Sequence, residues 1–152
     1  MSLQLAPGPT SLDRLETAIG RMLQKHGFLR VDSANQGFGH GLNAVLLTDD
    51  PQRNLEVLDA CVILPEALKA LGESVQRWVA GPETAPVLMQ RFGVPRAPAV
   101  VFLRNGEYLG GLNGIRDWNE YRNEVARLLH GPAQPKPIGI PVRAANTQGA
   151  CA

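Results

Sequence analysis

The chain has 152 residues, of which 44% are hydrophobic and 19% charged, and this composition suits one domain with a core of ordinary size. The formal net charge of +1 argues against a nucleic-acid binder, and no apolar run approaches the roughly 20 residues that span a bilayer. The N-terminus also lacks a basic region followed by an apolar one, so we expect a cytoplasmic protein with no signal peptide and no membrane insertion.

A short leader and an amphipathic helix are predicted at the N-terminus. Residues 1–10, which include two prolines, read as a flexible leader. Thr10 or Ser11 can cap a helix that begins near Leu12 and stops at Gly27. Apolar residues three and four positions apart predict its buried face, which comprises Leu12, Leu15, Ile19, Met22 and Leu23.

The middle of the chain predicts short strands separated by loops and one helix. Compact apolar runs predict strands over residues 28–31, 44–47 and 75–80. Residues 35–41 are rich in glycine, but they lack the third glycine of a dinucleotide-binding loop and precede their strand, so we interpret them as a plain loop. Residues 52–61 are predicted to be irregular. Pro65 fits the first turn of a helix, or a kink within one, that ends at Gly72.

The last third of the chain predicts a helix, a hairpin and a final helix. Helical spacing covers residues 83–92, and residues 99–104 read as a buried strand. Asn105-Gly106 is a strong hairpin signal, with residues 107–111 as the partner strand. Asp117 can cap the final helix, one face of which carries Trp118, Tyr121, Val125 and Leu128 or Leu129. Residues 132–152 are rich in proline and small residues and are predicted to be mostly disordered.

This order of elements predicts an α/β domain over residues 11–131, with a central mixed sheet and helices on both faces. The order resembles the thioredoxin fold, and Pro98 lies where thioredoxin-like proteins carry a cis-proline. The resemblance implies that the backbone before it, at Arg96 and Ala97, stays unpaired at the lip of a groove, where an extended peptide can pair as an added strand. The alternative is a trans Pro98 that merely begins an edge strand.

The paired cysteines of thioredoxins are absent from this sequence. A Cys-x-x-Cys motif would be expected after the central strand, but residues 51–62 hold only Cys61. Disulfide exchange needs an attacking and a resolving thiol, so a redox protein or sensor would have to use Cys61 alone or with Cys151. No metal-ligand spacing is present, the three histidines are far apart in sequence, and we expect no cofactor; they are His26, His40 and His130.

A second resemblance is more specific. Several short motifs are similar to those of the hydrogenase expression/formation proteins HyaE, HupG and HoxO, which are thioredoxin-like and lack Cys-x-x-Cys. The similarity covers about residues 18–131. The matching residues are Asp50-Pro51, Arg53, Glu56-Val57, Arg91-Phe92-Gly93, Pro98-Ala99, Phe102, Leu112-Asn113-Gly114-Ile115 and Trp118.

This resemblance implies an accessory protein and not an enzyme. Members of the group are described as chaperones in the assembly of uptake [NiFe] hydrogenases. The implied partner is the small subunit, through its twin-arginine signal peptide, its mature part or both. A second hydrogenase accessory protein is another possible partner.

Acidic residues gather in the segment that would replace the thioredoxin active-site loop. We hypothesise that they line a groove for a basic signal segment, with Leu55 or Trp118 as an apolar anchor. Arg53 and Lys69 oppose them. The alternative is a solvated loop, with Trp118 in the core. The acidic set comprises Asp49, Asp50, Glu56, Asp59 and Glu66.

Overall fold

The computed structural model describes residues 8–134, so most of the predicted leader, most of the predicted tail and Cys151 lie outside the described residues. The described chain contains helices and strands in the order expected, with most boundaries within two residues of their predicted positions. The helices are α1 (Ser11–Lys25), α2 (Glu56–Leu71), α3 (Ala85–Phe92) and α4 (Trp118–His130). The strands are β1 (Phe28–Arg30), β2 (Leu42–Leu47), β3 (Val75–Ala80), β4 (Ala99–Arg104) and β5 (Glu107–Asn113).

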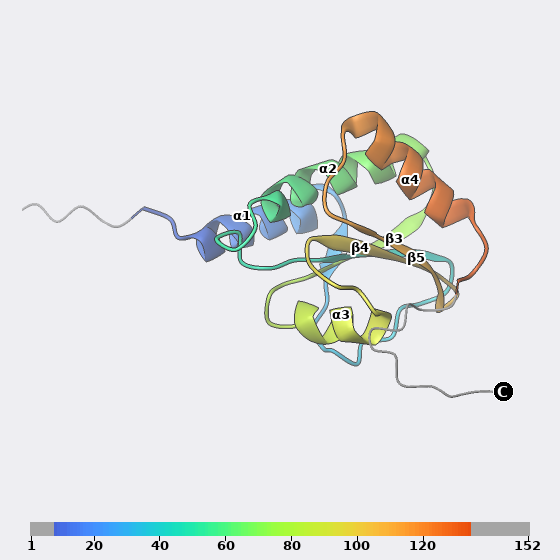
Figure 1. The fold of residues 1–152 in the computed structure, drawn as a ribbon, viewed down its shortest axis with the longest axis horizontal. Coiled ribbons are helices and arrows are strands. Elements are labelled where there is room, and N and C mark those ends of the chain that lie inside the picture. The colour runs from blue at the N-terminus through green and yellow to red at the C-terminus, as the bar shows by residue number, and fades with distance from the viewer. Residues whose placement is uncertain (1–7, 135–152) are drawn as a thin grey trace, which may run out of the picture.

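The strands form one mixed sheet in the order β1-β3-β2-β4-β5. β1 and β2 run parallel to β3 between them, while β4 is antiparallel to β2 and β5 is antiparallel to β4. Helices α1, α2 and α4 cover one face of the sheet, and α3 covers the other (Figure 1). The prediction of a thioredoxin-like α/β domain is therefore confirmed.

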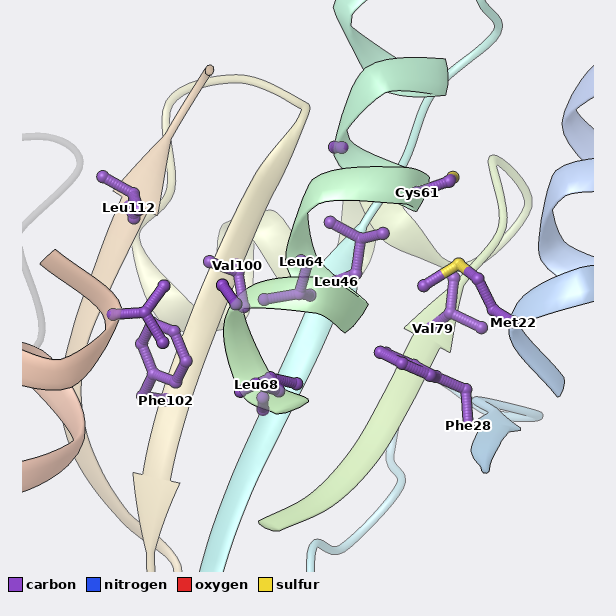
Figure 2. Close-up of a cluster of buried hydrophobic side chains, with 14 of the residues drawn as sticks. Met22, Phe28, Leu46, Cys61, Leu64, Leu68, Val79, Val100, Phe102 and Leu112 are labelled. Carbon is purple, nitrogen blue, oxygen red and sulfur yellow. The ribbon is translucent and has the colours of Figure 1, made fainter. Parts of the chain in front are cut away.

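Each face of the sheet has its own buried apolar cluster. The larger one joins α1, α2 and α4 to the sheet, with Leu64 and Leu68 of α2 lying over Leu46 and Val100 (Figure 2). The smaller one lies beneath α3 and includes Leu88. Because α2 lies between α1 and α4, it contributes more to the larger cluster than either neighbour, with six buried residues against three from α1 and four from α4.

The start of α2 differs from the prediction. Residues 52–61 were expected to be irregular, but the helix begins at Glu56 and holds Pro65 in its interior. The Asn54 side chain accepts a hydrogen bond of 2.9 Å from the Glu56 backbone N–H, which satisfies one of the N–H groups that the first turn of the helix leaves unpaired. An interior proline costs about 3 kcal/mol, and the buried face of α2 offsets this cost.

Two residues predicted on buried helix faces are instead exposed. Leu12 of α1 is 47% exposed and Trp118 of α4 is 40% exposed. Both lie in the first turn of their helices, and the buried residues begin one turn later, at Leu15 and Tyr121. Tyr121 and Val125 are buried as predicted.

The glycine-rich connection between β1 and β2 is a loop, as predicted, and it is held by side chains. Phe38 packs edge-on against Trp78, with ring centroids 5.3 Å apart. The Arg91 guanidinium lies over the Phe38 ring and donates a 2.7 Å hydrogen bond to the Gln36 carbonyl. The buried Asn43 side chain donates to the carbonyls of Gly39 and Gly41.

Strand β5 carries a bulge that changes which way its side chains point. Phe102 pairs with Gly110 and Leu103 pairs with Tyr108, so Leu109 is an extra residue. Gly110 has φ of +142°, and a Cβ atom there would lie 2.5 Å from Leu128 Cδ2 of α4. The position therefore requires glycine for both its backbone angle and its space.

No helix within residues 8–134 is long and apolar enough to cross a membrane.

We predict that Gly110→Ala lowers the free energy of unfolding by about 2 kcal/mol, because the methyl group clashes with Leu128 at an unfavourable φ. Urea denaturation followed by circular dichroism measures the change. The matched control is Gly20→Ala in α1, where no heavy atom lies within 4 Å of the new Cβ. This control should raise the free energy of unfolding by about 0.5–1 kcal/mol. Equal stability of the Gly110→Ala variant and the unmodified protein would contradict the account of the bulge.

Candidate partner-binding site

Three segments meet around the Ala97–Pro98 peptide bond, which is cis, as the resemblance implied. They are the loop leading into α2, the residues just before β4, and the connection from β5 to α4. We call this surface the cis-proline lip. It comprises Asn54, Glu56, Arg96, Ala97, Pro98, Asn113, Gly114 and Arg116.

Hydrogen bonds tie the three segments together at backbone carbonyls. The Gly114 N–H donates to the Pro98 carbonyl over 2.8 Å. Asn113 Nδ2 donates to the Arg96 carbonyl over 2.8 Å, and Asn54 Nδ2 donates to the Ala97 carbonyl over 3.3 Å. The expectation that the backbone before Pro98 is unpaired is therefore wrong for its carbonyls, because side-chain amides already occupy them.

The charges at the lip are mixed. Gly114 has φ of +73°, and the point where its Cβ would lie is 3.6 Å from Glu56 Oε1, 3.7 Å from Arg116 Nη1 and 3.8 Å from Arg96 Nη2. Arg116 Nη1 also donates to the Asn113 carbonyl over 2.7 Å. One carboxylate and two guanidinium groups thus lie around Gly114.

The predicted acidic residues separate into two groups. Asp50 accepts hydrogen bonds from the Ser11 hydroxyl and the Gln52 backbone N–H, and the Ser11 bond is the main reason that the pKa of Asp50 is below its usual value. Asp49 pairs with Arg53 across 3.2 Å. These two carboxylates therefore organise the loop before α2.

The remaining predicted acids lie on α2. Glu56 reaches the lip, and the exposed Asp59 follows it after one turn of the helix. Glu66 is exposed about two turns further along. Within residues 8–134, Asp59 and Glu66 have no ion-pair partner within 4.0 Å.

Two large apolar side chains lie next in sequence to the charged residues of the lip. Leu55, which precedes Glu56, is 71% exposed. Trp118, which follows Arg116 by two residues, is 40% exposed. Of the two alternatives for Trp118, the structure therefore favours a side chain that is available for contact over a core anchor.

Cys61 lies on α2 away from the lip. It is 4% exposed, and burial raises the pKa of its thiol to about 12. Figure 2 shows its side chain on the side of α2 that faces α1, near Met22. The reactive thiolate form is therefore scarce at neutral pH.

The histidines do not form a site with other ligands. His26 ends α1, His40 lies in the exposed loop before β2, and His130 contacts Glu73. Within the described part of the chain, no group of three or more His, Cys, Asp or Glu residues is placed to hold a metal ion.

Sequence reasoning missed the roles of four residues at the lip. Asn113 and Gly114 were noted only as part of a family motif, and Asn54 and Arg116 were not singled out. An asparagine just before a helix is a recognisable capping signal, so Asn54 was the one detectable from the sequence. The bonds to the Arg96 and Ala97 carbonyls depend on three distant segments meeting, which no local pattern shows.

Comparison with known proteins finds a family whose model covers all residues of the lip. The family model described as "Hydrogenase-1 expression protein HyaE" matches residues 18–121. The chain is 39% identical to hydrogenase expression/formation protein HoxO of Cupriavidus necator, over 97% of this chain and 94% of that protein. It is 35% identical to HoxO of Azotobacter vinelandii, over 86% and 84% of the two chains. It is 34% identical to HupG of Bradyrhizobium diazoefficiens, over 78% and 85%. The chain therefore belongs to the HyaE family of hydrogenase expression proteins.

Proposed function

We propose that this protein is a non-enzymatic chaperone in the maturation of an uptake [NiFe] hydrogenase. In this role it binds the small subunit, with its twin-arginine signal peptide, in the cytoplasm before export. The observation that carries the proposal is the family match across the whole lip, together with relatives named as hydrogenase expression/formation proteins. A second accessory protein of the same pathway would be compatible with this role.

The environment of Cys61 supports a holding role over electron exchange. A thiol that attacks a disulfide must be accessible and must ionise near the ambient pH. Cys61 is almost fully buried, and its pKa is raised to about 12. The start of α2, where thioredoxins carry their reactive cysteines, instead presents Leu55 and Glu56.

The lip and two exposed residues close to it in sequence, Leu55 and Trp118, offer three kinds of contact to a polypeptide. Leu55 and Trp118 supply exposed apolar surface, and the Glu56 carboxylate suits an arginine of the signal segment. The Asn54 bond to the Ala97 carbonyl is the longest of the three bonds at the lip. In our proposal, a partner N–H replaces Asn54 at that carbonyl, so that the partner pairs with the backbone at Ala97 as an added strand, while the Pro98 carbonyl keeps its bond to the Gly114 N–H.

We predict that Glu56→Lys weakens binding of the hydrogenase small-subunit precursor about fivefold at low salt, mainly through slower association. Surface plasmon resonance at two salt concentrations measures the effect, which should shrink at high salt. Glu107→Lys is the matched control, because it makes the same charge change at the start of β5, opposite Arg104 at the far end of β4 and about 20 Å away. Equal affinities for both variants at low salt would remove Glu56 from the binding surface.

We also predict that the protein does not catalyse the reduction of insulin by dithiothreitol, because Cys61 is buried and its thiol is protonated. Turbidity measures the reaction, and thioredoxin serves as the positive control. Turnover that disappears in a Cys61→Ser variant would contradict the chaperone proposal and favour a thiol redox protein.

A further inference from the structure

A groove separate from the cis-proline lip runs between α1 and α2. It consists of two adjoining hollows of about 160 and 390 Å³, which share Ala18 and Arg21. Arg14, Ala18 and Arg21 form the α1 wall, and Leu58, Val62 and Glu66 form the α2 wall. We call this surface the α1–α2 groove.

The α2 wall exposes an apolar stripe that the core does not use. Leu58 and Val62 are four residues apart, so they lie on the same side of the helix, and both line the groove. Leu58 is half-buried and Val62 is 61% exposed. A helix that is apolar on more than one side is normally covered on each of them, yet within residues 8–134 Val62 on this side of α2 is left facing solvent.

The walls of the groove determine what shape of polypeptide can occupy it. Both walls are helices whose interior N–H and C=O groups pair within the helix, apart from the Cys61 carbonyl, which lacks a Pro65 N–H, so they offer a partner almost only side chains. An extended peptide in the groove would bury its own backbone groups without partners, which is costly. A helix satisfies its backbone internally and needs only an apolar face toward the groove.

The charged residues at the rim of the groove indicate which charges the partner helix carries on its two sides. Arg14 and Arg21 are exposed seven residues apart on α1, while Glu66 is exposed across the groove on α2. None of the three has an ion-pair partner within 4.0 Å among residues 8–134. The complementary helix is acidic on the side toward α1 and basic on the side toward α2.

The floor of the groove fits an apolar anchor. Ala18 is small enough to let a partner helix approach, and the smaller hollow is lined by Met22 and Cys61 beneath it. Its volume of about 160 Å³ is similar to that of an apolar cavity of about 150 Å³ that admits benzene. The hollow thus has room for one leucine or phenylalanine side chain.

We propose that the α1–α2 groove is a second docking surface, which receives an amphipathic helix of the hydrogenase polypeptide. This inference rests on the proposed function, but it concerns a different surface from the lip. The partner helix places an apolar side chain over Ala18 and Cys61, its basic side against Glu66 and its acidic side against Arg14 and Arg21.

The test compares two exposed valines on opposite faces of the molecule. Val62→Asp places a charge in the apolar stripe, whereas Val87→Asp makes the same change on α3, where Val87 is 49% exposed. Calorimetric titration with the small-subunit precursor measures affinity. We expect Val62→Asp to weaken binding at least about tenfold and Val87→Asp to leave it unchanged, with both variants unfolding near the temperature of the unmodified protein.

A peptide experiment tests the helical shape of the occupant. Synthetic peptides of 20 residues that tile the precursor are titrated, and the binding peptide should gain helical circular dichroism. Two prolines in its centre should abolish that binding. Equal affinities of the Val62→Asp and Val87→Asp variants, or undiminished binding of the proline peptide, would overturn the groove while leaving the proposed function intact. No binding of the precursor to the unmodified protein would overturn the proposed function and the groove with it.

Discussion

The hydrogen bond from the Gly114 N–H to the Pro98 carbonyl holds the rest of the candidate site in place. It joins the end of β5 to the start of β4, and so fixes where the connection to α4 leaves the sheet. Asn113 then reaches the Arg96 carbonyl, and Arg116 lies beside Glu56 of α2. Gly114 adopts a positive φ, a backbone conformation that favours glycine, and three charged groups lie around it.

Helix α2 packs into the core on one side and faces solvent on the other, and the two sides require different residues. Its buried face supplies more of the larger core cluster than either neighbouring helix on that face of the sheet, and this favours apolar residues. Its first turn and outer side carry Leu55, Glu56 and Val62, which face solvent. A scaffold of this kind keeps a rigid helix under its contact residues, so little conformational entropy is lost when a partner binds. The fold thus supports binding without any reactive group at the helix N-terminus.

Local patterns predicted most of the fold because they depend on neighbouring residues. The Asn105-Gly106 turn, the apolar runs of the strands and the spacing along α4 each reflect a local rule, and each was found where expected. The start of α2 was not predicted because a proline usually lies in the first turn of a helix or interrupts it. In this protein Pro65 lies in the helix interior, and burial of the apolar face of α2 offsets its cost. The amide bonds of Asn54 and Asn113 were beyond prediction, since each joins residues 17 or more apart across the assembled fold.

The bulge in β5 connects the hairpin to a surface at the other end of the sheet. Leu109 and Gly110 both face α4, so the alternation of side chains is reset, and Leu112 enters the larger cluster instead of the smaller one. Asn113 takes its orientation from this reset. The bulge therefore determines which face of the sheet the rest of β5 presents: without its extra residue, the Asn113 side chain would point to the opposite face. A homologue without the bulge would need another one-residue insertion in β5 before the equivalent of Asn113 to keep the same contact surface.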